Sequence, residues 1–457
     1  MRVLVRGSDA IGTWYGLCGW LDSIRSEPDG LLRVGLDDQE GKPELRIRFT
    51  RPIQANPRFD SVEEMRASLD WWARWRMNVT GYPGPRWPTF IEESHQRGLR
   101  VLCALGVRKL CAADDRAVAD KVAEFERFLE LGGDGAVALW DDLPRERCKG
   151  HCDACRKRFG ENSLPREIVH VLESLAAVAA RRAAPSLIVW CPPHYSTRRY
   201  RDMPDEVFFR EVGNSAAVRR WTHMFYCEVL PEPVDLLERN GLTQRVWWYN
   251  GMRSVYHCRL WARAQDIDRD LKFPHNGFPR FESGWKMGVD IDANGGLVEA
   301  TVANRLALQT LPERYDGYYP CTALRPYHAA VGAVFAWSPH SFSQPEADRL
   351  VFRAMFGPQS ATTAREWSDL YDELQVWIAR HAGKNSSDSE FEHAKGLFER
   401  WRGRRRVLED LAARGQSLLA PPALAAALRE MQEAEQTIGT MLSEKPATTA
   451  PERPPRP

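Results

Sequence analysis

The feature that most constrains this chain is a long alternation of short apolar segments and amphipathic helical patterns, between residues 61 and 340. Ser61 and Glu64 form a capping-box pattern, and Met65 and Leu69 follow at helical spacing. Strands that alternate with helices build parallel sheets whose faces the helices cover. The candidate strands are residues 76–82, 99–105, 136–140, 187–190, 221–227, 245–249, 318–319 and 334–337.

This strand count predicts an α/β fold of the (β/α)8 TIM barrel type over residues 59–357. Residues 1–58 hold one strand, one helix and a short β segment (LRIRF), which is too little to bury a core alone. They are predicted to be a partial N-terminal α/β domain and linker. Residues 358–443 carry helical patterns that predict a C-terminal helical bundle, and the Pro-rich residues 444–457 predict a disordered tail.

Composition excludes some classes of function. The 457 residues include 63 Lys and Arg against 62 Asp and Glu, a formal net charge of +1, so bulk charge does not favour a nucleic-acid partner. No apolar run approaches the roughly 18–20 residues that span a bilayer. No signal peptide is visible, which makes a cytoplasmic location the default expectation, although the incomplete N-terminal domain suggests a truncated start.

The sequence Leu-Trp-Asp-Asp-Leu at residues 139–143 ends the third candidate strand. Active sites of β/α barrels lie at the C-terminal ends of the strands. Two adjacent carboxyl groups raise each other's proton affinity, so one can stay ionised while the other holds a proton near neutral pH. Asp141 and Asp142 are therefore the candidate catalytic pair. The alternative is a helix-capping or arginine-paired surface dipeptide.

Aromatic residues mark two other strand ends. Tyr195 closes the sequence CPPHY after the fourth strand, and Trp248 and Asn250 belong to WWYNG after the sixth. Aromatic rings stack on the apolar C–H faces of sugars, while phenol and amide groups bond sugar hydroxyls. These strand ends therefore suggest a carbohydrate site. Packing within the barrel is an equal alternative for Trp247 or Trp248.

The order of these segments is itself informative. GTWYG near the N-terminus is followed by LWDDL, WCPPHY, WWYNG and finally AVFAWSPHSF, which contains Trp337. In this order they resemble motifs of the β-N-acetylglucosaminidases of glycoside hydrolase family 84, which includes O-GlcNAc hydrolases and bacterial hyaluronidase-type enzymes. The resemblance covers roughly residues 1–360.

The resemblance implies a retaining hydrolysis in which the substrate's own N-acetyl oxygen attacks the anomeric carbon and forms an oxazoline. Asp141 would then orient the acetamido N–H, and Asp142 would serve as general acid and later as general base. A substrate-binding set would comprise Tyr195, Asn250, Trp248 and Trp337. The implied partner is a glycan or glycoconjugate that carries N-acetylglucosamine, and catalysis would require no cofactor.

The chain also departs from the family pattern. The family places an aspartate shortly after the asparagine of its WDN segment, where this chain has residues 252–255 (MRSV). An Asn-Pro motif and a lysine segment of the family are replaced by residues 319–322 (YPCT) and 81–84 (GYPG). These positions leave the identity of the sugar open.

Two alternatives to a hexosaminidase therefore stand. One is another barrel glycosidase that uses two separated carboxyl groups, Asp142 with Glu228 or Glu282. The other is a degenerate barrel that binds glycans without cleaving them.

Cysteines follow the Asp pair closely. Cys148, Cys152 and Cys155, with His151 between them, have a spacing typical of a metal site. The sequence is compatible with structural zinc, but it favours free or paired thiols. A structural zinc would shape the loop over the site rather than take part in catalysis.

Overall fold

The structure is a computed structural model of the whole chain. It describes residues 4–26, 32–34, 41–49, 61–81, 87–141, 143, 152–183, 186–194, 203–226, 231–242, 246–250, 317–320, 330, 333–334, 336–341, 344–381, 387–415, 417–418 and 421–443. The chain forms two compact units, of which one comprises residues 1–252 and 303–342 and the other residues 253–302 and 343–457. Each unit is described by itself.

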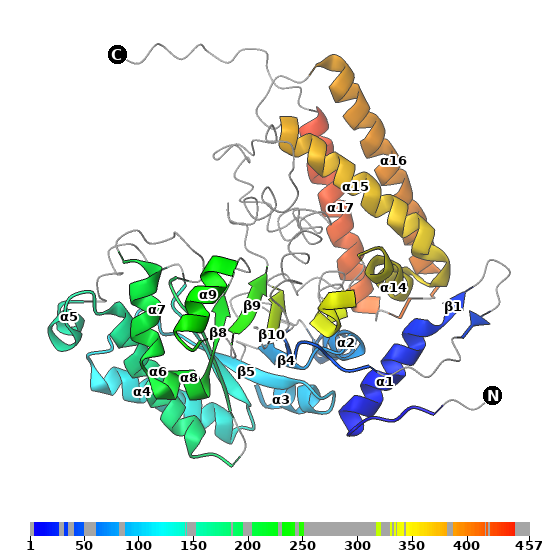
Figure 1. The fold of residues 1–457 in the computed structure, drawn as a ribbon. Helices are drawn as coiled ribbons and strands as arrows, with labels where there is room; N and C mark the ends of the chain where they lie inside the picture. The colour runs from blue at the N-terminus through cyan, green and yellow to red at the C-terminus, as the bar shows by residue number, and fades with distance from the viewer. Residues whose placement is uncertain are drawn as a thin grey trace, which may run out of the picture. The chain divides into compact units, whose positions relative to one another are not determined.

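An eight-stranded sheet organises the first unit (Figure 1). Its strands are β3 (Ile47–Arg48), β4 (Val79–Gly81), β5 (Arg100–Leu105), β6 (Gly135–Leu139), β7 (Leu187–Cys191), β8 (Thr222–Tyr226), β9 (Val246–Asn250) and β10 (Gly317–Pro320). Every pairing is parallel, in the order β3-β10-β9-β8-β7-β6-β5-β4. The mixed α/β class with a parallel sheet is therefore as predicted.

The strands at the two ends of this order also meet. Phe49, one residue beyond β3, forms a parallel bridge with Val79 of β4. The backbone N–H of Asn78 donates to the carbonyl of Arg48 at 3.1 Å, and the Asn78 side chain accepts from the Arg48 N–H at 2.8 Å. The sheet therefore has a link between its first and last strands.

Helices follow the strands in sequence. They are α2 (Val62–Arg74), α3 (Trp87–His95), α4 (Asp115–Glu130), α5 (Asp153–Phe159), α6 (Leu164–Ala180), α7 (Asp205–Gly213), α8 (Ala216–Trp221) and α9 (Pro231–Arg239). The predicted cap of α2 is present, because Ser61 Oγ accepts from the Glu64 N–H at 3.0 Å. Asp114 caps α4 by accepting from two backbone N–H groups, and Gly132, with φ 95°, follows the end of that helix.

The core of the sheet is made by alternate residues of the strands. Val137 of β6, Val189 of β7 and Phe225 of β8 form one buried cluster with Phe49 and Val79. Their neighbours along each strand point to the other face, where the helices lie. This alternation decides which side of the sheet a residue at a strand end will face.

One predicted strand is wrong. The described part of the segment Val334–Trp337 is helical, and the strand beside β10 is instead β3, from the LRIRF segment. The backbone N–H groups of Glu44 and Leu45 donate to the carbonyls of Trp337 and Ala336. A short apolar run does not distinguish strand from buried helix. Because β3 comes from residues 1–58, part of the predicted N-terminal segment lies in the main sheet.

The helix expected within residues 1–58 is α1 (Ala10–Ser23). Asp9 caps it, accepting from the Gly12 N–H at 2.6 Å. Residues 4–7, the described part of the strand predicted before it, have no strand structure. Two short strands, β1 (Arg25–Ser26) and β2 (Leu32–Arg33), pair antiparallel after α1.

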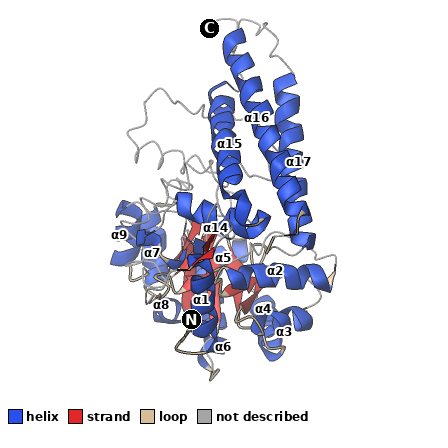
Figure 2. Cartoon of the chain, turned by 90° about the vertical axis from the view of Figure 1, so that its right-hand side faces the viewer, coloured by secondary structure: helices blue, strands red, loops and turns tan. Residues whose placement is uncertain are grey.

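The second unit is helical in its described part (Figure 2). Its longer helices are α14 (Gln344–Phe356), α15 (Ala361–His381), α16 (Asp388–Ala413) and α17 (Pro421–Ser443). Trp367 of α15 and Trp401 of α16 stack with ring centroids 5.7 Å apart, and Ser387 and Glu390 form a full capping box. No helix within the described residues has the length and apolar character needed to cross a bilayer.

Candidate active site

Asp141 lies at the C-terminal edge of the parallel sheet. Strand β6 ends at Leu139, and the N–H of Trp140 still donates to the carbonyl of Cys191 at 2.9 Å, so the pairing with β7 extends one residue further. Val137 and Leu139 belong to the core face. Asp141 continues this alternation, and only 4% of its surface is exposed.

Arg108 holds the buried carboxylate. Its Nη2 lies 2.5 Å from Asp141 Oδ1. The register of the two strands explains the pairing. Leu105 of β5 is opposite Ala138 of β6, so Arg108 and Asp141, each three residues further along, are level with each other. The Arg108 side chain is 43% exposed while that of Asp141 is 6% exposed. The guanidinium therefore balances the charge of a carboxylate that has little access to water.

Arg108 is not among the site residues predicted from the sequence. The available signal was a basic residue shortly after the strand that neighbours β6, but a single arginine in a loop gives no indication of its partner. Only the parallel register of β5 and β6 makes the pairing specific. Asp141 is thus paired with an arginine, but it is buried rather than part of a surface dipeptide, and it lies at the edge of the sheet where barrel active sites lie.

The other predicted site residues are placed only in part. Asp142 and Tyr195 lie outside the described residues, as do Glu228 and Glu282. The backbones of Trp248 and Asn250 lie in β9. Asn250 is the last residue of that strand, so its position in the chain is at the same edge of the sheet as Asp141.

Trp337 lies at the opposite end of the sheet from Asp141. Its backbone carbonyl accepts from Glu44, which precedes β3. Its ring packs edge-on against Tyr15 with centroids 5.4 Å apart, and the guanidinium groups of Arg48 and Arg76 lie 5.3 and 5.0 Å from it. Because Arg76 precedes β4, the aromatic and arginine side chains around Trp337 lie at the end of the sheet where the strands begin. The structure therefore does not bring Trp337 together with Asp141.

A buried histidine stabilises the loop that leads toward Tyr195. His194 has no exposed surface, and its Nδ1 shares a hydrogen bond of 2.7 Å with Asp205 Oδ1. Its ring stacks on Phe208 of α7 with centroids 4.5 Å apart. The C-terminal end of β7 is thereby attached to α7.

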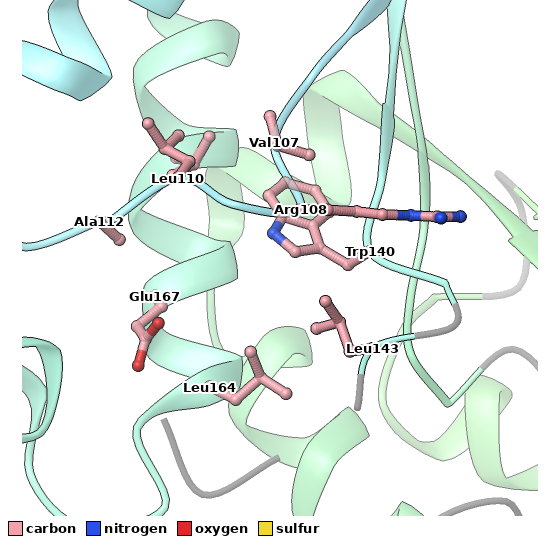
Figure 3. A pocket seen from close by; sticks show the side chains of 9 residues that line it. Val107, Arg108, Leu110, Ala112, Trp140, Leu143, Leu164 and Glu167 are labelled. Atoms are coloured by element: carbon pink, nitrogen blue, oxygen red, sulfur yellow. The ribbon is translucent and has the colours of Figure 1, made fainter. Parts of the chain in front are cut away.

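A small cavity lies on the helix side of Trp140 (Figure 3). Its volume is about 10 Å³, room for about one water molecule. The side chain of Trp140 points to the face of the sheet opposite to that of Asp141, because neighbouring residues of a strand alternate. In Figure 3 the guanidinium of Arg108 lies on the far side of the Trp140 ring from Glu167. Glu167 is a polar residue in the wall of this cavity, and its carboxyl group accepts a hydrogen bond from Ser163 Oγ at 2.5 Å. The cavity is too small for a sugar.

Three cysteines meet beside this region. Cys111 Sγ lies 3.4 Å from Cys152 Sγ and 3.6 Å from Cys155 Sγ. Burial by itself would raise the pKa of the Cys152 thiol, but hydrogen bonds from the backbone N–H of Cys155 and from Cys111 outweigh it and lower that pKa. Burial raises the pKa of the Cys155 thiol. Cys148 and His151 lie outside the described residues, and sequence spacing gave no indication of Cys111.

Comparison with known proteins supports the fold. No family model and no curated protein matches the sequence. Among solved structures, CpGH84B is similar with a TM-score of 0.56 and 12% identity, covering 96% of this chain and 74% of that one. A mutant of the Thermobaculum terrenum O-GlcNAc hydrolase has a TM-score of 0.48 and 12% identity, covering 89% and 98%. The predicted likeness to glycoside hydrolase family 84 is thus confirmed for the fold.

Proposed function

We propose that the chain is a glycoside hydrolase, a retaining β-N-acetylhexosaminidase that acts on glycans or glycoconjugates carrying N-acetylglucosamine. The observation that carries this proposal is the buried Asp141 carboxylate, held by Arg108 at the C-terminal edge of an all-parallel sheet. A second carboxyl group, that of Asp142, follows it directly in sequence. The fold similarity to CpGH84B supports the same class of enzyme.

The proposal includes a closed (β/α)8 barrel. The parallel bridge between Phe49 and Val79 supports closure, because it links the strands at the two ends of the sheet order. In a closed barrel the C-terminal ends of all eight strands surround one opening, so Asp141 and Asn250 would border the same substrate pocket.

In the first step the acetamido oxygen of the substrate attacks the anomeric carbon while the bond to the leaving oxygen breaks. Asp141 accepts a hydrogen bond from the acetamido N–H, which becomes more acidic as the oxazoline ring forms. A well-oriented acceptor is needed here, and the Arg108 guanidinium 2.5 Å away holds the Asp141 carboxyl group in place. Arg108 is therefore a positioning residue that acts through Asp141.

Asp142 completes the chemistry as acid and base. It donates its proton to the leaving oxygen in the first step and takes a proton from water in the second. That water attacks the anomeric carbon and opens the oxazoline, which restores the acetamido group and retains the β configuration. Tyr195, Asn250 and Trp248 serve in substrate binding, through hydrogen bonds near the acetamido group and stacking on the ring.

Aryl β-N-acetylglucosaminides test this function. Asp142→Asn should lower turnover about 10²–10⁴-fold for substrates with poor leaving groups and less for activated aryl groups, which need little protonation. Azide should restore part of its activity and yield the β-glycosyl azide. Asp141→Asn should lower turnover for all leaving groups without azide rescue. Asp369→Asn, an exposed change in the helical unit, is the matched control.

Each alternative has its own outcome. Equal turnover of plain aryl β-glucosides would show that the acetamido group is not used, and loss of activity in Glu228→Gln or Glu282→Gln would then favour two separated carboxyl groups. Tight binding of an N-acetylglucosamine-thiazoline mimic without turnover of any substrate would identify a glycan-binding barrel. Activity in both Asp variants equal to that of the unaltered protein would refute the proposed mechanism.

A further inference from the structure

The cysteine cluster joins segments that are far apart in the chain. Cys111 lies in the loop between β5 and α4, while Cys152 immediately precedes α5 and Cys155 lies within it. The three sulfur atoms lie within 4.8 Å of one another. Cys155 is fully buried, and the other two are partly exposed. The sequence motif contains only two of these three residues, so the convergence is a property of the fold.

The sulfur separations match a tetrahedral metal site. Zinc binds thiolate sulfur at about 2.3 Å, which places two sulfur ligands of a tetrahedron about 3.8 Å apart. The distances of 3.4 and 3.6 Å from Cys111 Sγ are close to this value. A disulfide would need a separation of about 2.0 Å, and one disulfide would leave the third thiol unused.

The sequence spacing of two of the cysteines also favours a metal site. Cys152 and Cys155 have the C-x2-C spacing of zinc sites, at the start of a helix. This spacing lets two sulfur atoms of one short segment reach the same ion, and Cys111 adds a third from a distant loop.

We propose that Cys111, Cys152 and Cys155 bind one structural zinc ion, which ties the loop after β5 to helix α5. Zinc in a structural site takes a fourth ligand in addition to these three sulfur atoms. This proposal does not depend on the proposed glycosidase activity.

The site has a structural use here. Helix α5 has seven residues, too few to be stable by itself. Among the described residues, Cys155 and Phe159 anchor it, and the ring centroids of Phe159 and His170 lie 5.5 Å apart. Cys111 follows Arg108 by three residues. A zinc ion at Cys111 therefore restrains the loop that presents Arg108 to Asp141.

Metal content of the full chain, purified without added metal, tests the proposal. We expect about one zinc per chain by mass spectrometry, released when a mercurial reagent blocks the thiols. Cys111→Ser should lose most of the zinc, although Cys111 lies outside the sequence motif. Cys18→Ser, at a buried cysteine in α1, is the matched control and should retain it.

A second measurement covers the case in which Cys111→Ser does not fold. X-ray absorption at the zinc edge of the unaltered protein should show at least three sulfur neighbours near 2.3 Å. Fewer than three sulfur neighbours, iron in place of zinc, or a metal-free protein would overturn the proposal. A disulfide between Cys111 and Cys152, found by mass spectrometry in the protein as isolated, would overturn it as well.

Discussion

Arg108 and Asp141 meet across two neighbouring parallel strands, with Nη2 of the arginine 2.5 Å from Oδ1 of the aspartate. They are 33 residues apart in sequence and are level because of the register of β5 and β6. The pair places a compensated negative charge at the edge of the sheet where an amino sugar would be bound in the proposed reaction.

Arg108→Met should impair both activity and stability. Without the guanidinium, the buried Asp141 carboxyl group loses the hydrogen bond that fixes its orientation and becomes a poorer acceptor for the acetamido N–H. We expect kcat to fall more than KM changes, because the acetamido N–H bond to Asp141 strengthens only as the oxazoline ring forms. The free energy of unfolding should fall by about 1–3 kcal/mol, less than for a fully buried pair because Arg108 is 43% exposed.

Lys109→Met is the control for this change, since it removes a neighbouring positive charge from the same loop. Urea unfolding and steady-state kinetics of both variants provide the comparison. An Arg108→Met protein with an unchanged kcat would contradict the role given to the ion pair.

Removal of metal should destabilise the protein. Zinc that binds only the folded chain adds its binding free energy to stability, so a strong chelator should lower the melting temperature of the unaltered protein. The chelator should not alter the melting temperature of Cys111→Ser. Differential scanning calorimetry with and without chelator measures both. An equal decrease in the two proteins would mean that the chelator acts elsewhere.

The His95–Asp134 pair should make stability depend on pH. The hydrogen bond that His95 Nε2–H donates to Asp134 Oδ2 at 2.8 Å raises the pKa of His95 in the folded protein. Because the pKa is raised, the stability that the pair contributes is fully present below the unfolded pKa of about 6.5. It is lost as pH rises through the pKa of the folded protein. The free energy of unfolding of the unaltered protein should therefore exceed that of His95→Gln by the largest amount near pH 5.5 and by the smallest amount near pH 8.

Urea unfolding at several pH values measures this difference, and NMR titration of the His95 ring locates the pKa itself. A stability difference that grows from pH 5.5 to pH 8 would contradict the sign of the shift.

The core of the sheet should tolerate truncation poorly. Leu102 of β5 is fully buried among Val137, Val189 and other core residues. Leu102→Ala should lower the free energy of unfolding by about 2–5 kcal/mol, because it removes buried methyl groups and leaves a cavity. Leu131→Ala removes the same atoms from a side chain that is 50% exposed and should cost well under about 1 kcal/mol. Similar effects of the two changes in chemical denaturation would place Leu102 outside a tightly packed core.

The sequence by itself determined the local elements. Ser61 and Asp114 begin helices because their side-chain oxygens bond the first free N–H groups, and apolar runs such as residues 100–105 become strands because both faces are buried. The helices of the second unit follow from their apolar spacing in the same way. The domain boundaries at residues 58 and 357 stay predictions.

Tertiary structure alone decided which of these elements meet. It made Ile47–Arg48 a strand of the main sheet and the described residues of 334–337 helical, and it brought Arg108 to Asp141 and Cys111 to Cys152. A periodic pattern records which face of a segment is buried, since that depends on neighbours a few residues away. It does not record which distant segment covers that face, because register and pairing depend on packing across the whole unit.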